Sequence, residues 1–155
     1  MSQELYNELF NAISQESEVM VGLQLNAAHS EPMYAHVDKD RDTNLWFFMA
    51  NDNRVASGGK SMIQFVSKDH KLFACMSGDL VEETDPDTLE KFWSNSTEAW
   101  FEGGIDDPKL HMMRFELQNV EIWTKTPNLT GALKLASGAK VEPEDVGDHA
   151  VVDIK

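Results

Sequence analysis

Three shortages limit what this chain can be. Only one of its 155 residues is a cysteine, Cys75, so no internal disulfide can form. No apolar stretch approaches the roughly 18 residues of a membrane-spanning helix, and the first residues lack the basic and apolar regions of a secretion signal. These absences predict a cytoplasmic protein with no membrane partner. The length predicts a single domain over residues 1–155.

Positive charge is also scarce. Lysine and arginine number 13 against 27 aspartate and glutamate residues, so the formal net charge is −14. So negative a surface repels phosphate backbones over most of its area, and this argues against nucleic acid as a partner. A phosphate-bearing ligand would need cations supplied locally.

The usual catalytic and metal-binding motifs are missing as well. The chain has no nucleophile elbow, no P-loop and no dinucleotide-binding glycine pattern. Its five histidines are scattered, without the spacing of a metal site. The catalytic residues are therefore unknown from sequence, and no metal is predicted.

Aromatic and methionine side chains are plentiful, with four Trp, eight Phe and eight Met. Such residues fill cores first and bind flat heterocycles second. Residues 45–50 read Leu-Trp-Phe-Phe-Met-Ala, an apolar run with no alternation, so both faces of this strand must be covered. We expect the second cover to be a partner subunit or a flat ligand. With the helical aromatic stripe that includes Trp93 and Trp100, the run predicts a homodimer.

Hydrophobic periodicity predicts an α+β fold, a small antiparallel barrel of six strands with flanking helices. The expected strands are 19–25, 33–37, 45–50, 62–66, 72–80 and 113–122. The expected helices are 2–14, 86–100 and 130–136, and one further turn is expected between Asp106 and His111. Alternation changes phase at Gln118-Asn119, which predicts a β-bulge in the last strand.

Five segments in order resemble the general stress proteins among the pyridoxamine 5'-phosphate oxidase-like FMN-binding split barrels. They are Pro32-Met33, the Leu-Trp-Phe-Phe run from Leu45, Met76-Ser77-Gly78, the block from Ala99 to Pro108 (AWFEGGIDDP), and Glu121-Ile122-Trp123. The resemblance implies a six-stranded antiparallel split β-barrel that forms a homodimer with FMN at the subunit interface. It also implies a flavin-binding stress-type protein, with slow oxidoreductase activity as one reading.

The resemblance also implies which residues line the cofactor site. In that family the second strand lies along the flavin ring, and the end of the third strand and the next turn reach the ribityl and phosphate. A Trp near the end of the long helix lies close to the cleft. The corresponding residues here are Met33, Tyr34, Phe48, Met49, Asn53, Arg54 and Trp100.

Three positions depart from the family pattern. Glu31 replaces a basic residue before the Pro-Met pair, Met49 replaces a threonine, and Val55 stands at a lysine position. Arg54 is then the cation expected to meet the phosphate. Two other readings stay open: a flavin-free split-barrel dimer that acts as a binding or interaction protein, and a heme-handling split barrel if His36 or His111 faces the cleft.

Overall fold

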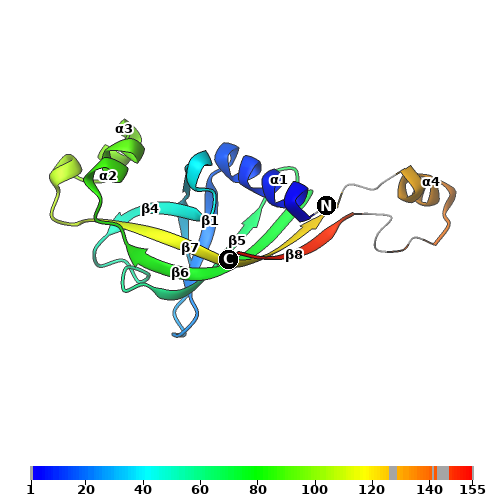
Figure 1. The fold of residues 1–155 in the computed structure, drawn as a ribbon, viewed down its shortest axis with the longest axis horizontal. Helices are drawn as coiled ribbons and strands as arrows, with labels where there is room; N and C mark the ends of the chain where they lie inside the picture. Colours follow the sequence, from blue (N-terminus) through cyan, green and yellow to red (C-terminus); the bar gives the residue numbers. More distant parts are fainter. Residues whose placement is uncertain (1, 126–128, 141, 143–146, 155) are drawn as a thin grey trace.

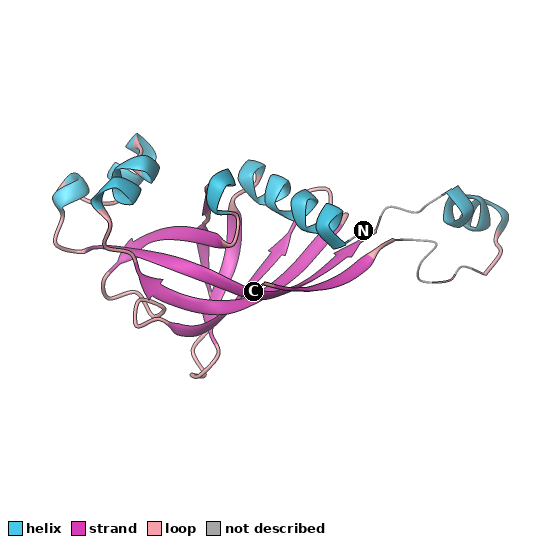
Figure 2. Cartoon of the chain, viewed as in Figure 1, coloured by secondary structure: helices cyan, strands magenta, loops and turns pink. Residues whose placement is uncertain are grey.

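The computed structural model describes residues 2–125, 129–140, 142 and 147–154. One strongly curved antiparallel sheet dominates the fold, and helix α1 (Ser2–Gln15) lies along it (Figures 1 and 2). The sheet order is β2-β1-β5-β6-β7-β4-β3, and β8 also pairs with β7. The family resemblance thus predicted the architecture correctly, with a strand count slightly too low.

The strands run along the chain in the following order. They are β1 (Glu18–Leu23), β2 (Glu31–Tyr34), β3 (His36–Val37), β4 (Asn44–Ala50), β5 (Gly59–Val66), β6 (Leu72–Glu82), β7 (Leu110–Thr124) and β8 (His149–Asp153). The expected second strand is in fact two, because the chain changes partner at Ala35: β2 pairs with β1, and β3 pairs with β4. Strand β8 lies in the acidic C-terminal segment, which alternation alone did not identify.

The core lies between α1 and the inner face of the sheet. Leu9 and Ile13 of α1 are fully buried, as are Phe47, Phe65 and Ile122 from three different strands. These residues follow the helical spacing of α1 and the two-residue alternation of the strands, which explains why both were predictable.

The predicted bulge is confirmed. In the β6–β7 ladder Ser77 pairs with Asn119 while Gly78 pairs with Leu117, so Gln118 is left without a partner in that ladder. A side chain at Gly78 would collide with the carbonyl oxygen of Glu116, which lies on β7. Glycine therefore lets two long strands approach closely where the bulge bends them.

The helical region after β6 differs from the prediction of one helix through Trp100. Helix α2 (Pro86–Phe92) begins at the N-cap Asp85 and ends at Trp93, whose backbone is extended. Ser94 then caps a separate short helix, α3 (Asn95–Glu98), through its hydroxyl. The expected turn between Asp106 and His111 is present but shorter: the Asp107 side chain accepts a hydrogen bond from the Lys109 amide, and β7 already begins at Leu110. The 3-10 helix η2 (Gly104–Asp106) precedes this turn.

Two further helical segments complete the described chain. The 3-10 helix η1 (Lys39–Arg41) follows β3, and helix α4 (Leu129–Ser137) agrees with the predicted 130–136. Figure 1 places α4 at the opposite end of the long axis from α2 and α3. Within the described residues, no helix is long and apolar enough to cross a membrane.

Candidate functional site

Strand β2 is an edge of the sheet, since it begins the strand order and pairs only with β1 among the described residues. An edge strand presents peptide N–H and C=O groups that no neighbouring strand uses. Side chains alternate along it: Met33 packs against the core, while Tyr34 is 60% exposed on the other face. Of the two residues predicted here, Tyr34 offers the larger side-chain surface to a ligand, and Met33 is partly buried.

Tyr34 is the exposed end of an aromatic cluster centred on His36. The imidazole of His36 lies 5.0 Å from the Tyr34 ring, 5.2 Å from Phe48 and 5.5 Å from Phe92. Burial lowers the pKa of His36 to about 4, so the ring is neutral at physiological pH. Three aromatic rings surround this imidazole, which leaves the heme reading without support from His36. His36, which the flavin prediction did not include, thus links Tyr34 to Phe48.

The outer face of β4 is covered by the chain itself. The indole of Trp46 contacts Phe92 at 5.1 Å, the guanidinium of Arg41 lies 4.5 Å from its ring, and its Nε1 donates a hydrogen bond to Glu83. Phe48 meets Trp93 edge-on at 5.6 Å. At Trp46 the second cover is thus α2 and not the expected partner or ligand, whereas Phe48 on the same face stays only partly buried.

Asp38 holds that helix in position. Its carboxylate is almost buried and accepts hydrogen bonds from Lys91 Nζ of α2 at 2.8 Å and from Arg41 Nε at 2.9 Å. These two bonds lower the pKa of Asp38 to about 2. An ionised Asp38 therefore joins η1 to α2 beside the aromatic cluster.

The turn after β4 carries the other predicted residues. The Asn53 side chain accepts a hydrogen bond from the Val55 amide and so shapes the turn. The Arg54 side chain is 44% exposed, and its Nε lies 3.0 Å from the carboxylate of Glu31, the first residue of β2. Val55 is only 1% exposed and belongs to the core, as does Met49. Among these residues Arg54 alone presents a charge to solvent.

Trp100 lies apart from these groups. It is 84% exposed in the turn after α3, whereas its neighbour Phe101 is buried and contacts Trp93 at 6.3 Å. The break at Ser94 turns the chain, so the spacing that placed Trp93 and Trp100 on one helical stripe does not apply. His36 and Phe92 belong to the aromatic cluster, and Trp100 does not. The sequence signal for the break was the run of N-cap residue types at positions 94–97.

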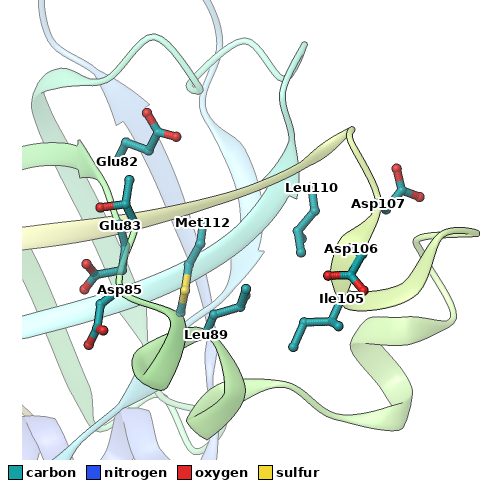
Figure 3. Close-up of a pocket in the computed structure, with 10 residues that line it drawn as sticks. Glu82, Glu83, Asp85, Leu89, Ile105, Asp106, Asp107, Leu110 and Met112 are labelled. Carbon is teal, nitrogen blue, oxygen red and sulfur yellow. The ribbon is translucent and has the colours of Figure 1, made fainter.

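A cavity of about 310 Å³ lies between the end of β6, α2, η2 and the start of β7 (Figure 3). Its charged lining is entirely acidic: Glu82, Glu83, Asp85, Asp106 and Asp107. Burial opposes ionisation of Glu83, but hydrogen bonds from Trp46 and Arg114 outweigh it and lower its pKa. Because the lining contains no cation, a dianionic phosphate would be repelled from this cavity.

The groups suited to a flat anionic ligand lie along β2. Tyr34 ends this strand and Arg54 pairs with Glu31 at its beginning, about 10 Å away along the backbone, and the side chains of Glu31 and Tyr34 point to opposite faces of β2. A ring joined to a phosphate by a short chain can bridge that interval across the strand edge, where unpaired peptide carbonyls can accept hydrogen bonds, although Pro32 between the two ends has no N–H to donate. The residues present thus fit a flavin at Tyr34, Arg54 and the strand edge.

The comparisons with known proteins agree with this fold. The model of the family described as pyridoxamine 5'-phosphate oxidase like matches residues 4–145. A general stress FMN/FAD binding protein from Xanthomonas citri is 34% identical, with a TM-score of 0.74, over 82% of this chain and 93% of that one.

Two further solved structures are similar. A general stress family protein from Xanthomonas campestris pv. campestris is 34% identical over 82% of this chain and 92% of that one, with a TM-score of 0.70. General stress protein 26 from Jannaschia sp. CCS1 shares the fold at 24% identity, with a TM-score of 0.83 over 99% of this chain and 100% of that one. A search of curated proteins found no match.

Proposed function

Because the chain belongs to the pyridoxamine 5'-phosphate oxidase-like family, whose model matches residues 4–145, we propose that it binds FMN along the edge of β2. Tyr34 would lie against the ring and Arg54 beside the phosphate. The observation that carries this proposal is the exposure of Tyr34 at the end of β2 and of Arg54, which lies in the turn after β4 and pairs with Glu31 at the start of β2, a strand with one edge unpaired among the described residues. The FMN/FAD binding protein from Xanthomonas citri, at 34% identity, supports the choice of a flavin.

A bound flavin would supply electron-transfer chemistry, and slow oxidoreductase activity is part of the proposal. The residues of this chain would bind and orient it. Burial holds the nearby His36 neutral, so its imidazole is not a proton donor at neutral pH. Phe48, Asn53 and Met49 would act indirectly, by supporting the cluster, the turn and the core.

We also propose that the protein is a cytoplasmic homodimer of single-domain subunits. The support for the dimer comes from the outer sheet face, defined here as the outward residues of β1 and β5–β8. Register places Met20, Gln64, Cys75, Glu121 and Val151 in one row across five strands. Val66, Phe73 and Trp123 share the next row, and Met20, Val66, Trp123 and Val151 are large apolar side chains left exposed. A second copy is the occupant that would cover this face.

Flavin titration of the purified protein tests the proposal. We expect FMN fluorescence to be quenched on binding, and Arg54→Gln to weaken FMN binding by up to about tenfold while riboflavin, which lacks the phosphate, is nearly unaffected. Lys60→Gln is the matched control, since Lys60 is the next cation along the chain and is exposed.

The other readings predict different results. A colourless protein that does not respond to FMN or riboflavin would contradict the proposal and favour a flavin-free binding protein. A Soret band in the freshly purified protein would indicate heme. Equal losses for FMN and riboflavin in Arg54→Gln would show that Arg54 acts through the turn and not through the phosphate.

A further inference from the structure

The guanidinium of Arg54, which we propose binds the phosphate, already forms an ion pair with a carboxylate of the protein. Arg54 Nε lies 3.0 Å from Glu31 Oε1, and one Nη donates a hydrogen bond to the carbonyl oxygen of His29 at 3.3 Å. Both partners come from the end of the β1–β2 loop and the start of β2. The turn after β4 is therefore tied to the edge strand by its one exposed cation.

These contacts use both edges of the guanidinium. Arginine binds a phosphate best through two parallel N–H bonds along one edge. Glu31 takes the edge that contains Nε, and the His29 carbonyl takes part of the opposite one. A phosphate that approaches the Nε edge for a two-bond contact must displace Glu31. Its carboxylate is chemically equivalent to the incoming anion.

Glu31 is not a freely moving surface carboxylate. It is the first residue of β2 and is paired in register with the buried Val21, and its side chain is only 27% exposed. Arg54 is likewise restrained, because the Asn53 side chain and the buried Val55 hold the turn. The ion pair is therefore set by the backbone on both sides, and the carboxylate stays near the guanidinium even when displaced from it.

We infer that Glu31 is a specificity-determining residue that competes with the flavin phosphate for Arg54 and so reduces the preference for FMN over riboflavin. The inference rests on the proposed flavin function and deepens it. In this reading the site prefers FMN over riboflavin by no more than about tenfold, because Glu31 already neutralises part of the charge that the phosphate meets.

The test measures FMN and riboflavin dissociation constants for four proteins: wild type, Glu31→Gln, Arg54→Gln and the double variant. We expect Glu31→Gln to strengthen FMN binding roughly three- to tenfold at low salt, because it removes a partly exposed competing charge. Riboflavin should change less than twofold. The gain should shrink at high salt and vanish in the Arg54→Gln background.

Glu8→Gln is the matched control. It removes the same charge from the exposed face of α1, so it changes the net charge without touching the β2 edge. It should leave the affinities for both flavins unchanged. If Glu31→Gln does not fold, Glu31→Thr carries the same test with a side chain that suits a strand.

Three results would overturn the inference. Weaker FMN binding in Glu31→Gln would mean that Glu31 positions Arg54 for the phosphate. Equal changes for FMN and riboflavin would mean that the ion pair acts only on the loop. A gain that persists without Arg54 would place the effect elsewhere. Riboflavin binding to the wild type separates these cases from failure of the proposed function: if neither flavin binds any of the proteins, both proposals fall.

Discussion

The imidazole of His36 can be protonated, but the aromatic rings around it disfavour the charged form. Burial lowers its pKa from 6.5 to about 4. The unfolded chain binds a proton as the pH falls through about 6.5, while the folded chain resists protonation down to about 4. The stabilisation is therefore present above pH 6.5 and is lost progressively between pH 6.5 and 4.

We predict that His36→Phe makes the free energy of unfolding less dependent on pH between 6.5 and 4. A change of pKa from 6.5 to about 4 corresponds to a loss on the order of 3 kcal/mol in the wild type at acid pH. Denaturant unfolding at pH 7, 5.5 and 4 measures it. His70→Phe is a control, since His70 is exposed in a turn. An equally steep decline in His36→Phe would show that another group causes the acid sensitivity.

The burial of Val55 in the core was not predicted from the sequence. By the family pattern this position belongs to a lysine near the phosphate, yet the side chain is in the core. Two neighbours in one turn thus point in opposite directions, and only Arg54 reaches outward. Turn geometry decides this, and a local pattern of small and polar residues does not specify which side chain turns inward.

At the scale of elements, α2 determines the environment of β3 and β4. Its last residue, Phe92, contacts both His36 and Trp46, and Lys91 reaches the nearly buried Asp38. The helix has only seven residues, so its own hydrogen bonds are marginal, and these tertiary contacts must stabilise it. The helix and the aromatic cluster therefore form together.

We predict that Phe92→Ala destabilises the protein by about 2–3 kcal/mol, because it removes a ring packed between an indole and an imidazole. Tryptophan emission should shift to the red as Trp46 meets water, and the pKa of His36, followed by NMR, should rise. Trp100→Ala, in the same region but 84% exposed, should change stability by less than about 0.5 kcal/mol. Equal effects of the two variants would contradict this packing.

At the scale of the whole molecule, the exposed apolar surface lies on a different part of the fold from the one that the sequence predicted. The apolar run in β4 and the Trp93 region cover each other and cannot supply a dimer interface by themselves. The outer sheet face leaves several large side chains exposed in adjacent rows. These apolar side chains share their rows with polar ones such as Gln64, Glu121 and His149, and such a mixture of apolar and polar groups is typical of an interface.

We predict that Val66→Lys on the outer sheet face converts the proposed dimer to a monomer, because a charge would be buried without a partner. Sedimentation equilibrium at micromolar concentration measures the state. Leu25→Lys is the control, since Leu25 is more exposed than Val66 but lies in the β1–β2 loop. A wild-type protein that is monomeric at these concentrations would refute the dimer, and with it a flavin site shared between subunits.

The sequence by itself determined the features that depend on local spacing and local chemistry. These include the helix α1, most strands, the bulge at Gln118 and the start of α2 at Asp85-Pro86. Hydrophobic periodicity, capping residues and a change in the phase of alternation all depend on neighbouring residues, so they can be identified without knowledge of the fold. The order of the family segments added the architecture of the barrel.

Tertiary structure decided what depends on contacts between distant residues. The pairing of Arg54 with Glu31 joins two turns that are far apart in sequence, and the packing of Phe92 on Trp46 folds a later helix over an earlier strand. Strand β8 exists because β7 offers it an edge, although its own residues alternate only weakly. A side chain's burial and partners depend on the sum of such contacts, and no window of neighbouring residues contains that sum.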